Sequence, residues 1–455
     1  MAKLYSARWV LPIASGPLEG GAVAVEGGRV VGVGARRELA EKFRGAEAED
    51  FGEAVIMPGF VNCHTHLELT AMRGFLEDVE GDFFAWLKKL TVARMLRMTA
   101  EDLYVSAAWG AVEALRAGVT CVGDASDSAV TTMKALRDVG LRGIVYQEVF
   151  GPDANEAREQ FEQARDKLAS LRAGENEWVT LGVSPHAPYT VSRPLLELLT
   201  EHAVSERLPL MMHAAESHAE ELFVREGRGP FAESYEARGI EWRAPGVSTV
   251  QYLARVGLLR ARPLLAHCVR TDEADIETLR ESKAGVAHCP KSNAKLGHGR
   301  APFAAFVRAG LDVGLGSDSV ASNNTCDLLE EARFAALVSR AAGDTLEGGR
   351  MLGDAEALRA ATEGGARALG LGHQTGVLVE GKAADLTVVG LGGAHQQPVH
   401  DPSTALLFAS TGRDVRLTMV AGRELFRDGR VTGVDELELG LRMRDLARRL
   451  AGAER

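Results

Sequence analysis

The amino-acid sequence predicts an α/β protein: a (β/α)₈ barrel of the TIM type with a small β-sandwich domain formed by both termini. Three observations predict this fold. Short buried strands alternate with longer amphipathic helices through the middle of the chain, short glycine-bounded strands occur at both ends, and 455 residues are about three times a common domain length. One large domain with an appendage accommodates all three.

Composition and charge narrow the classes of function. The chain is 46% hydrophobic and 25% charged, which is ordinary for a globular protein with a sizeable core. Its net charge of −11 argues against non-specific binding to nucleic acid, which needs a basic surface, and leaves a small molecule as the expected partner. No apolar run has the length of a membrane span or a signal peptide, so no membrane association and a cytoplasmic location are expected.

The cysteines are odd in number, are spread along the chain and include no Cys-x-x-Cys pair. They are Cys63, Cys121, Cys268, Cys289 and Cys326. We expect reduced thiols, and neither a disulfide framework nor a cysteine-ligated zinc site.

Both ends of the chain have the pattern of short antiparallel strands, rich in valine and separated by turn glycines. The segments are 21–26, 28–34, 384–389 and 415–426. Residues 1–57 and 373–455 are therefore expected to form the β-sandwich together. Leucines at helical spacing in 436–455 predict a terminal amphipathic helix that packs on the barrel or on a partner subunit.

Residues 58–372 are predicted to form the barrel, because buried strands and amphipathic helices alternate there. Eight strands are expected, at 54–61, 119–124, 143–149, 179–184, 208–213, 263–267, 284–288 and 311–316. Helices are expected between them at 100–117, 155–171, 193–205, 272–282 and 327–342. Eight alternations fit a closed barrel better than an open, doubly wound sheet.

In such a barrel the chemistry lies at the carboxyl ends of the strands. The polar residues at or just after these ends are His64, His66, Asp124, Glu148, His186, His213, Glu216, His267, His288 and Asp318. Six of the 12 histidines are in this set, which is more than scatter would place there. Asp124 can instead cap a turn, and His288 can instead fill the barrel mouth.

Three histidines and one aspartate of this set have the pattern of metal ligands. His64 and His66 are one residue apart, so on an extended chain both imidazoles point the same way and can reach one ion. With His213 and Asp318 they form an N₃O set that suits Zn²⁺, with Fe²⁺ or Mn²⁺ as alternatives. A water in the open position would have its pKa lowered toward about 7. Binuclear sites of this layout need a carboxylated lysine from the fourth strand, and 179–184 has no lysine, so one ion is expected.

Two further groups are candidates for proton transfer. Glu216 follows His213 by three residues, and a carboxylate within reach of an activated water can take its proton and return it to the substrate. His267 ends a strand and can orient the nucleophile or polarise the substrate. The alternatives for His267 are a ligand of a second ion and a hydrogen-bonded core histidine. Asp318 would serve both as ligand and as base.

Several motifs together resemble the amidohydrolase superfamily, and most closely its branch of aminohydrolases that act on adenine nucleosides and other nitrogen heterocycles. They are PGFVNCHTH at 58–66, SPHAPY at 184–189, HAAE at 213–216, AHCV at 266–269, SNAKLGHG at 292–299 and LGSDSVASNN at 315–324. The resemblance covers nearly the whole chain. It implies a deformed barrel with a terminal β-sandwich, one metal ion and, commonly, a homodimer. The matched positions are the ligands His64, His66, His213 and Asp318, the proton-transfer groups Glu216 and His267, and a substrate-contacting histidine, His186.

One position departs from this pattern. Methylthioadenosine and S-adenosylhomocysteine deaminases have a glutamate for the ribose hydroxyls where this chain has Met95, and a thioether accepts such hydrogen bonds poorly. Glu68 and the segment 81–87 look more like those of aminodeoxyfutalosine deaminases. Glu68 could equally orient a ligand histidine. The candidates for lining the pocket are Glu68, Arg73, Phe83, Trp86 and Glu148.

The hypothesis from the sequence is hydrolytic deamination of a 6-aminopurine nucleoside, aminodeoxyfutalosine or another 5′-substituted adenosine. The activated water attacks C6, Glu216 moves a proton to N1, and ammonia leaves. One alternative keeps the metal centre and changes the bond that breaks, in a triazine, a cyclic amide or a guanine-like ring. The other is a non-catalytic scaffold, which would be expected to lack a ligand or the proton shuttle, and this chain has both.

Overall fold

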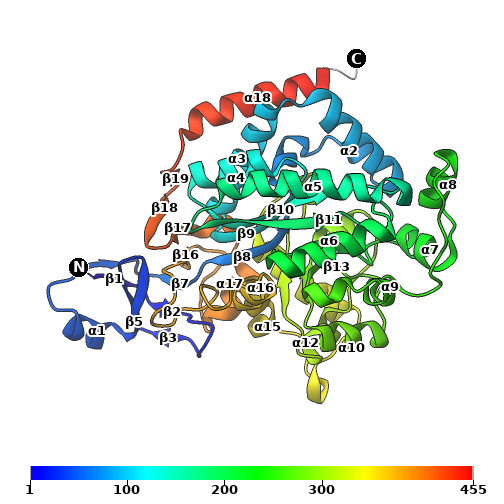
Figure 1. Ribbon diagram of the computed structural model, residues 1–455. Helices are drawn as coiled ribbons and strands as arrows, with labels where there is room; N and C mark the ends of the chain where they lie inside the picture. Colours follow the sequence, from blue (N-terminus) through cyan, green and yellow to red (C-terminus); the bar gives the residue numbers. More distant parts are fainter. Residues whose placement is uncertain (1, 453–455) are drawn as a thin grey trace.

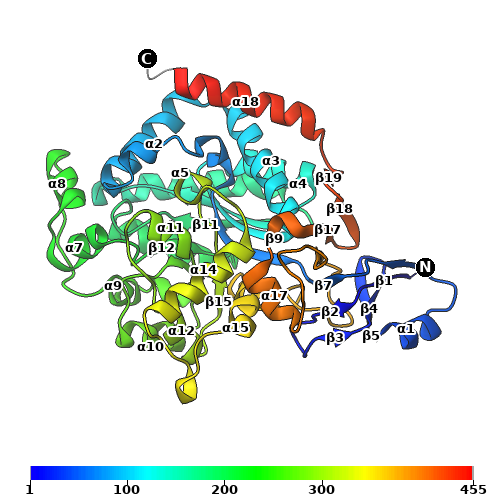
Figure 2. The ribbon, with the colours of Figure 1, turned by 180° about the vertical axis from the view of Figure 1, so that it is seen from behind.

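The computed structural model of the protein describes residues 2–452. It has a mixed α/β architecture, with parallel strands at the centre, helices packed around them, and further sheets made from the ends of the chain (Figure 1). The small blue sheet of the first residues projects from one side of the molecule in both views (Figures 1 and 2).

The central strands form two four-stranded sheets, with the orders β11-β10-β9-β8 and β12-β13-β14-β15. Neighbouring strands in each sheet are parallel. Their bounds are β8 Phe60–Thr65, β9 Val119–Ser126, β10 Arg142–Val149, β11 Val179–Pro185, β12 Met211–Ala214, β13 Leu264–His267, β14 Gly285–His288 and β15 Val313–Leu315. All but the first lie where the sequence predicted them.

The two central sheets are connected by backbone hydrogen bonds on both sides. On one side the amide of Val183 donates to the carbonyl of Pro209 at 2.9 Å, and the amide of His213 donates to the carbonyl of His186 at 3.0 Å. On the other side the amide of Asp318 donates to the carbonyl of His64 at 2.8 Å. The residues that follow β8, β12 and β15 are thereby brought to one end of the molecule.

The first predicted strand, 54–61, is corrected by the structure into two strands in different sheets. β7 (Ala54–Pro58) belongs to the sheet made by the chain ends, and β8 begins at Phe60. Gly59 lies between them, where an added Cβ would be 2.1–2.7 Å from the side chain of Thr120. The sequence does not reveal that the chain passes from one sheet to another at Gly59, because both strands are buried and form one continuous apolar run.

The helices have bounds close to the predicted ones where a prediction was made. They are α1 Arg36–Lys42, α2 Phe83–Arg97, α3 Ala100–Arg116, α4 Ala129–Val139, α5 Ala157–Leu171, α6 Arg193–Glu206, α7 His218–Glu226, α8 Pro230–Ala237, α9 Thr249–Arg255, α10 Glu273–Ser282, α11 Pro290–Lys295, α12 Phe303–Arg308, α13 Val320–Asn323, α14 Leu328–Ala341, α15 Asp354–Arg359, α16 Gly365–Ala368, α17 Pro402–Ala409 and α18 Glu436–Gly452. Side-chain caps define several starts: Thr99 and Asp102 form a capping box for α3, as Asp272 and Asp275 do for α10.

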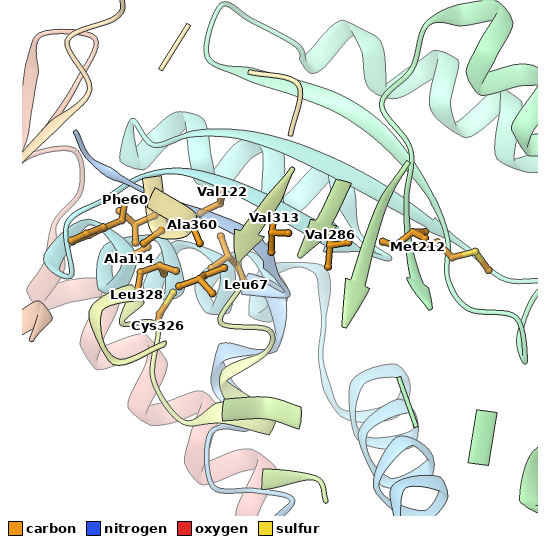
Figure 3. Packing of buried hydrophobic residues seen from close by; sticks show 14 of the residues in the cluster. Phe60, Leu67, Ala114, Val122, Met212, Val286, Val313, Cys326, Leu328 and Ala360 are labelled. Atoms are coloured by element: carbon orange, nitrogen blue, oxygen red, sulfur yellow. The ribbon is translucent and has the colours of Figure 1, made fainter. Parts of the chain in front are cut away.

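The main hydrophobic core lies between the central strands and their helices. Figure 3 shows Phe60 of β8, Ala114 of α3 and Leu328 of α14 gathered at one end of this layer. Met212, Val286 and Val313 continue the layer along the second sheet. Burial of these side chains is the main stabilising contribution to the arrangement of the strands.

The ends of the chain form two more sheets, with the orders β5-β4-β1-β6 and β19-β18-β17-β16-β7-β2-β3. The bounds are β1 Lys3–Ser6, β2 Trp9–Val10, β3 Leu18–Glu19, β4 Gly21–Glu26, β5 Arg29–Ala35, β6 Glu47–Asp50, β16 Leu386–Gly390, β17 Val415–Val420, β18 Arg423–Arg427 and β19 Arg430–Val431. In the second sheet β16 pairs antiparallel with β7, so strands from both ends of the chain share it. Tyr5 and Val23 of the first sheet pack in one cluster with Ile56, Leu386 and Leu417 of the second.

The predicted terminal helix is confirmed as α18, and positions 453–455 of the predicted segment lie outside the described residues. α18 contacts α3, and its buried residues are Leu439, Leu446 and Leu450 (Figure 2). All five cysteines are free and buried. Within residues 2–452, no helix combines the length and the apolar character needed to cross a membrane.

Candidate active site

The four side chains predicted as metal ligands lie together at the carboxyl ends of the central strands. His64 lies in β8 and His66 directly follows it, His213 lies in β12, and Asp318 follows β15. The Nε2 atoms of His66 and His213 are 3.1 Å apart. Oδ1 of Asp318 lies 3.3 Å from Nε2 of His64 and 3.6 Å from Nε2 of His66. The site therefore joins the two central sheets.

Hydrogen bonds made by the far side of each ring fix which nitrogen faces the centre. Nδ1 of His213 lies 3.0 Å from the carbonyl oxygen of His186, and Nδ1 of His267 lies 2.9 Å from Oδ1 of Asn293. Both rings therefore keep Nε2 free. Such outer partners are typical of histidines that bind a metal ion.

The unsatisfied atoms of this cluster fit a cation. Nε2 of His64 and Nε2 of His267 are buried and have no hydrogen-bond partner among the described residues. Single ligand atoms of His64, His66 and His213 lie within 4.8 Å of one another, as do those of His64, His267 and Asp318. Nitrogen lone pairs and a carboxylate oxygen that converge without a donor between them are the donor set of a divalent ion such as Zn²⁺.

Electrostatics keep the groups in the protonation states that such an ion requires. Burial, followed by the neighbouring His64, lowers the pKa of His66 to about 4. Burial and His186 lower the pKa of His213 well below its ordinary value. For Asp318, burial favours the neutral acid, but the adjacent His64, whose Nε2 lies 3.3 Å from Oδ1, outweighs burial and holds the pKa of Asp318 well below its ordinary value. These shifts favour neutral imidazoles at His66 and His213 and an ionised carboxylate at Asp318.

Glu216 lies beside the cluster with two histidine partners. Its Oε1 is 3.6 Å from Nε2 of His267 and 3.3 Å from Nε2 of His298. Burial would raise the pKa of Glu216, but His267 and His298 outweigh burial and lower it. Burial likewise opposes the charged form of His267, and Glu216 and Asp318 outweigh it and raise the pKa of His267. The two groups thus form a buried pair suited to holding and moving a proton.

The loop that carries Glu216 is held by a second buried acid, Glu220 of α7. Glu220 accepts hydrogen bonds from the amides of Ala215 at 2.8 Å and Glu216 at 2.9 Å, and from the hydroxyl of Thr249 at 2.8 Å. Ala215 has a positive φ of 52°, as do His267 (75°) and Asp318 (57°). Non-glycine residues adopt this region at a cost, and such strain collects at functional sites.

Sequence reasoning missed three supporting residues: Glu220, Asn293 and His298. Asn293 and His298 belong to the motif at 292–299, which follows β14 and was recognised without roles for its members. Glu220 follows Glu216 by four residues at the start of α7, a spacing that allows a side chain to bond the preceding backbone. Glu220 thus bonds the loop directly before its own helix, whereas the partners of Asn293 and His298 are His267 and Glu216, which lie at or after other strands.

A cavity of about 480 Å³ opens onto the cluster. α2 forms one wall of it with Phe83, Trp86, Leu87, Leu90, Thr91, Arg94 and Met95. Phe83 and Trp86 stack with ring centroids 6.2 Å apart. Phe150, His186 and Tyr189 lie on the side of β10 and β11. Aromatic walls of this kind suit a planar heterocycle.

Two predicted pocket residues differ in their surroundings. Glu68 lines the cavity, but both of its oxygens are bonded: Oε1 accepts from Nε of Arg94 at 2.8 Å, and Oε2 accepts from the hydroxyl of Ser126 at 2.6 Å. Arg73 is corrected, because it lies outside the cavity. Its guanidinium pairs with Glu113 and lines a separate hollow beside the terminal strands. The half-buried Glu113, rather than a ligand, explains the orientation of Arg73.

Asp124 and His288 also lie outside the cavity wall. Asp124 is buried and accepts from the hydroxyl of Thr65 at 2.8 Å and the amide of Leu67 at 2.7 Å, so it holds the turn that follows β8. His288 lines a small separate cavity and packs against Phe303 with ring centroids 5.2 Å apart. The sequence left both assignments open.

Glu148, near the end of β10, and His186, directly after β11, lie side by side on one wall of the cavity. Oε1 of Glu148 lies 4.0 Å from Nε2 of His186. Burial, followed by the charge of Glu68, raises the pKa of Glu148 well above its ordinary value, and burial and His66 lower the pKa of His186 to about 3. Glu148, His186 and His213 are also close enough to hold an ion. However, His213 offers a single free nitrogen, which already faces His66.

Comparison with known proteins gives consistent results. The model of the Amidohydrolase family matches residues 55–425. A 5-methylthioadenosine/S-adenosylhomocysteine deaminase of Pelotomaculum thermopropionicum is 33% identical over 435 residues, which are 95% of each chain. Another protein of that name, from Syntrophobacter fumaroxidans, is 34% identical over 437 residues, covering 94% of this chain and 93% of its own.

A solved structure is similar over nearly the full length. It is an adenosine deaminase from Xanthomonas campestris with bound zinc, with a TM-score of 0.87, 30% identity and coverage of 99% of this chain and 98% of its own.

Proposed function

This chain belongs to the amidohydrolase family, and on that premise we propose that it is a metal-dependent hydrolytic deaminase that releases ammonia from an adenosine derivative. The observation that carries the proposal is the convergence of three histidines and an aspartate beside the buried Glu216–His267 pair, at the end of an aromatic cavity. The deaminase names of the relatives, at 30% identity or more, support the same class of reaction.

One divalent ion is the proposed cofactor. The ligands are His64, His66, His213 and Asp318, and the free Nε2 atoms and the ionised carboxylate support this set. Zn²⁺ is the proposed metal, with Fe²⁺ or Mn²⁺ as alternatives, and the relative with bound zinc supports it. When bound, such an ion acts as a Lewis acid and lowers the pKa of a water molecule.

The residues of the chain then supply proton transfer. Glu216 is ionised and within reach of His267, so it accepts a proton from the attacking water and delivers it to N1 of the purine. His267, held by Asn293, hydrogen-bonds the water and orients it toward C6. Asp318 accepts hydrogen bonds from Ser292 and Ser322 through Oδ2 and from the amide of Ser319 through Oδ1, which fixes the carboxylate with Oδ1 toward the histidines. In that position it accepts the second proton of the water and passes it to the departing amino group, which leaves as ammonia.

The aromatic walls bind the purine, and the outer part of the cavity accepts the 5′ substituent. A 5′-substituted adenosine, aminodeoxyfutalosine among them, is therefore the proposed substrate. Phe83 and Trp86 on α2 and His186 on the opposite side are the proposed ring contacts, while Glu68 supports Arg94 at the rim. Hydrolysis of a triazine, a cyclic amide or a guanine-like ring has no comparable support.

We also infer the finer architecture. The hydrogen bonds that link the two central sheets on both sides support one closed (β/α)₈ barrel over 58–372. The cluster shared by the sheets of the chain ends supports a β-sandwich over 1–57 and 373–455, from which α18 returns to the barrel. A homodimer is the proposed assembly, on the resemblance to the family alone.

The test is a deamination assay with the purified, zinc-loaded protein. The panel contains adenosine, methylthioadenosine, S-adenosylhomocysteine and aminodeoxyfutalosine, with a chlorotriazine, a cyclic amide and guanine beside them, and ammonia is measured. We expect turnover of at least one adenosine derivative, loss of activity with a chelator, and its return with Zn²⁺. Turnover of the other heterocycles alone, or none at all, would overturn the proposal.

A further inference from the structure

Glu148 carries a buried oxygen that no hydrogen bond satisfies. The residue ends β10, its exposed fraction is 9%, and it lines the cavity that opens onto the metal ligands. Its Oε1 is buried and has no hydrogen-bond partner among the described residues. Because buried polar atoms are nearly always paired, such an atom at a cavity wall indicates a group that the ligand supplies.

The other acids on this side of the cavity are already paired. Glu68 uses Oε1 for Arg94 and Oε2 for the hydroxyl of Ser126 and the amide of Ser128. Asp127 pairs with Arg94 at 2.7 Å and is more exposed, with 39% of its side chain accessible. Of these three acids, Glu148 is thus the one with a buried oxygen that is still available for a hydrogen bond.

His186 presents a second acceptor to the same space. The hydroxyl of Thr190 donates to the carbonyl of Ala187 at 3.1 Å, so it accepts from Nδ1–H of His186, which lies 2.8 Å away. A neutral imidazole that donates through Nδ1 has a bare lone pair at Nε2. Nε2 of His186 lies 4.0 Å from Oε1 of Glu148. A ligand group between these two atoms could therefore hydrogen-bond to both.

We propose that Glu148 binds a hydroxyl group of the substrate ribose, beside His186. This inference rests on the proposed function. A hydroxyl both donates and accepts, so it satisfies Oε1 of Glu148 in either protonation state and donates to Nε2 of His186 as well. Two neighbouring hydroxyls, as in an unmodified ribose, can serve the two residues separately.

Glu148 thereby takes over a role that the pattern of the related deaminases gives to another position. Met95 occupies that position here, and 68% of it is exposed at the rim of the cavity. Its thioether cannot replace a carboxylate as acceptor. Glu68, the other candidate, is a support for Arg94 and the turn at Ser128, because its oxygens are committed.

The test compares ribosides with their 2′-deoxy and 3′-deoxy forms in the zinc-loaded enzyme. In the unmodified protein, we expect removal of the bound hydroxyl to lower kcat/KM about 10- to 100-fold. In Glu148→Ala, kcat/KM for the riboside falls by a similar factor, and the difference between riboside and deoxyriboside shrinks to about twofold. Glu148→Gln, which keeps one acceptor, retains part of that difference.

Two further variants separate recognition from folding. Glu156→Gln changes an exposed glutamate of the loop after β10. It should leave unchanged both kcat/KM for the riboside and the ratio of kcat/KM between riboside and deoxyriboside. Glu68→Gln should affect ribosides and deoxyribosides equally. The inference is overturned if Glu148→Ala keeps the full preference for the riboside, or if Glu68→Gln loses it.

A binding measurement keeps this inference separate from the proposed function. The deaminated products, one with ribose and one with deoxyribose, are titrated by calorimetry into the unmodified protein and into Glu148→Ala. This measurement needs no turnover. If the unmodified protein deaminates no adenosine derivative, the proposed function fails. Hydroxyl recognition is still supported if the unmodified protein binds the deoxyriboside more weakly than the riboside and Glu148→Ala does not. Equal binding of the two products to the unmodified protein would overturn the inference that Glu148 binds a ribose hydroxyl.

Discussion

At the scale of single residues, the rings of His213 and His267 are oriented by hydrogen-bond partners outside the proposed ligand set. The carbonyl of His186 and the amide oxygen of Asn293 leave Nε2 free on His213 and His267. Two serines occupy Oδ2 of Asp318, so Oδ1 is the atom that faces the histidines. The geometry therefore depends on groups that lie outside the proposed ligand set.

Glu216→Gln tests the proton carrier. Because a carboxamide cannot take up and return the proton, we expect kcat to fall about 10²- to 10⁴-fold. Glu216 lies outside the proposed ligand set, so the zinc content should stay at one per chain, and this separates the variant from His213→Ala, which should lose zinc. Glu226→Gln, at an exposed glutamate that ends α7, the helix after the loop of Glu216, is the control. A small drop in kcat for Glu216→Gln would contradict the assignment.

The sequence was most informative where residues act at strand ends. The four proposed ligands and Glu216 could be chosen because each follows a predictable buried strand. Asn293 and His298 could not be assigned, because their roles depend on which side of the cluster the segment after β14 approaches. Arg73 was misplaced because a charged residue soon after β8 looks the same in sequence whether it faces the cavity or Glu113.

At the scale of elements, the crossing at Gly59 decides where the first central strand begins. β7 pairs with β16 in the sheet of the chain ends, and the next residue after Gly59 opens β8. The backbone passes so close to Thr120 that no side chain fits there. A two-residue shift in this crossing would change the register of His64 and His66.

Gly59→Ala should therefore destabilise the protein by about 1–3 kcal/mol, because the added methyl group overlaps Thr120. Thermal or denaturant unfolding measures the change. Gly16→Ala is the matched control, since an added Cβ there meets nothing within 4 Å and the φ is ordinary. Equal unfolding of the two variants would show that the neighbouring strand yields without cost.

α14 contributes a buried acid, Glu331, that supports two segments around the site. It accepts from Nδ2 of Asn323 at 2.6 Å and from the amide of Lys291 at 3.2 Å. Burial raises the pKa of Glu331 from 4.5 to about 8, against the opposing charge of Lys291. Between these two values the folded protein holds one more proton than the unfolded chain.

Stability should therefore fall as the pH rises from 4.5 through about 8, by at most about 1.4 kcal/mol per pH unit from this group. The contribution is fully present below pH 4.5 and lost above the folded pKa. In Glu331→Gln this part of the slope disappears, while the exposed Glu347→Gln keeps it. Denaturant unfolding at several pH values across the window measures both, and an unchanged slope in Glu331→Gln would refute the assignment.

Most elements were predictable because periodicity is a local property. α3, α6 and α14 begin and end within a residue or two of the predicted bounds. The split between β7 and β8 was missed because periodicity shows burial and does not identify the sheet that buries a strand. Phe83 and Trp86 were predicted to line the pocket and do so, but the helix that carries them, α2, was not predicted, since its apolar residues are spread around the helix.

At the scale of the whole molecule, one buried ion pair joins the central strands to the strands of the C-terminal region. Arg142 of β10 donates to Asp385 through Nε at 2.8 Å and through Nη2 at 3.2 Å. The amide of Ala421, just after β17, also donates to Asp385 at 2.7 Å. Three segments far apart in the chain thus meet at one carboxylate.

Asp385→Asn should destabilise the protein by about 3–5 kcal/mol, because the charge of Arg142 is left buried without its partner. Both regions should lose stability together, as one shifted unfolding transition. Asp166→Asn, at an exposed pair with Arg165, should have little effect. Two separate transitions in the unmodified protein would instead show that the regions unfold independently.

The overall architecture could be predicted from the number of strand–helix alternations and from the short, glycine-bounded strand patterns at both ends of the chain. The pairing of β7 with β16 could not, because it depends on contacts between residues more than three hundred positions apart. The link between Arg142 and Asp385 is also invisible to local patterns.

The placement of the proposed ligands across both central sheets has a consequence for the newly made chain. His64 and His66 leave the ribosome early, but Asp318, the last member of the set, is made late in a chain of 455 residues. A nascent polypeptide therefore holds several exposed imidazoles long before it can close a complete coordination sphere. With this proposed ligand set, capture of the ion would belong to the final stage of synthesis, after the second sheet has joined the first.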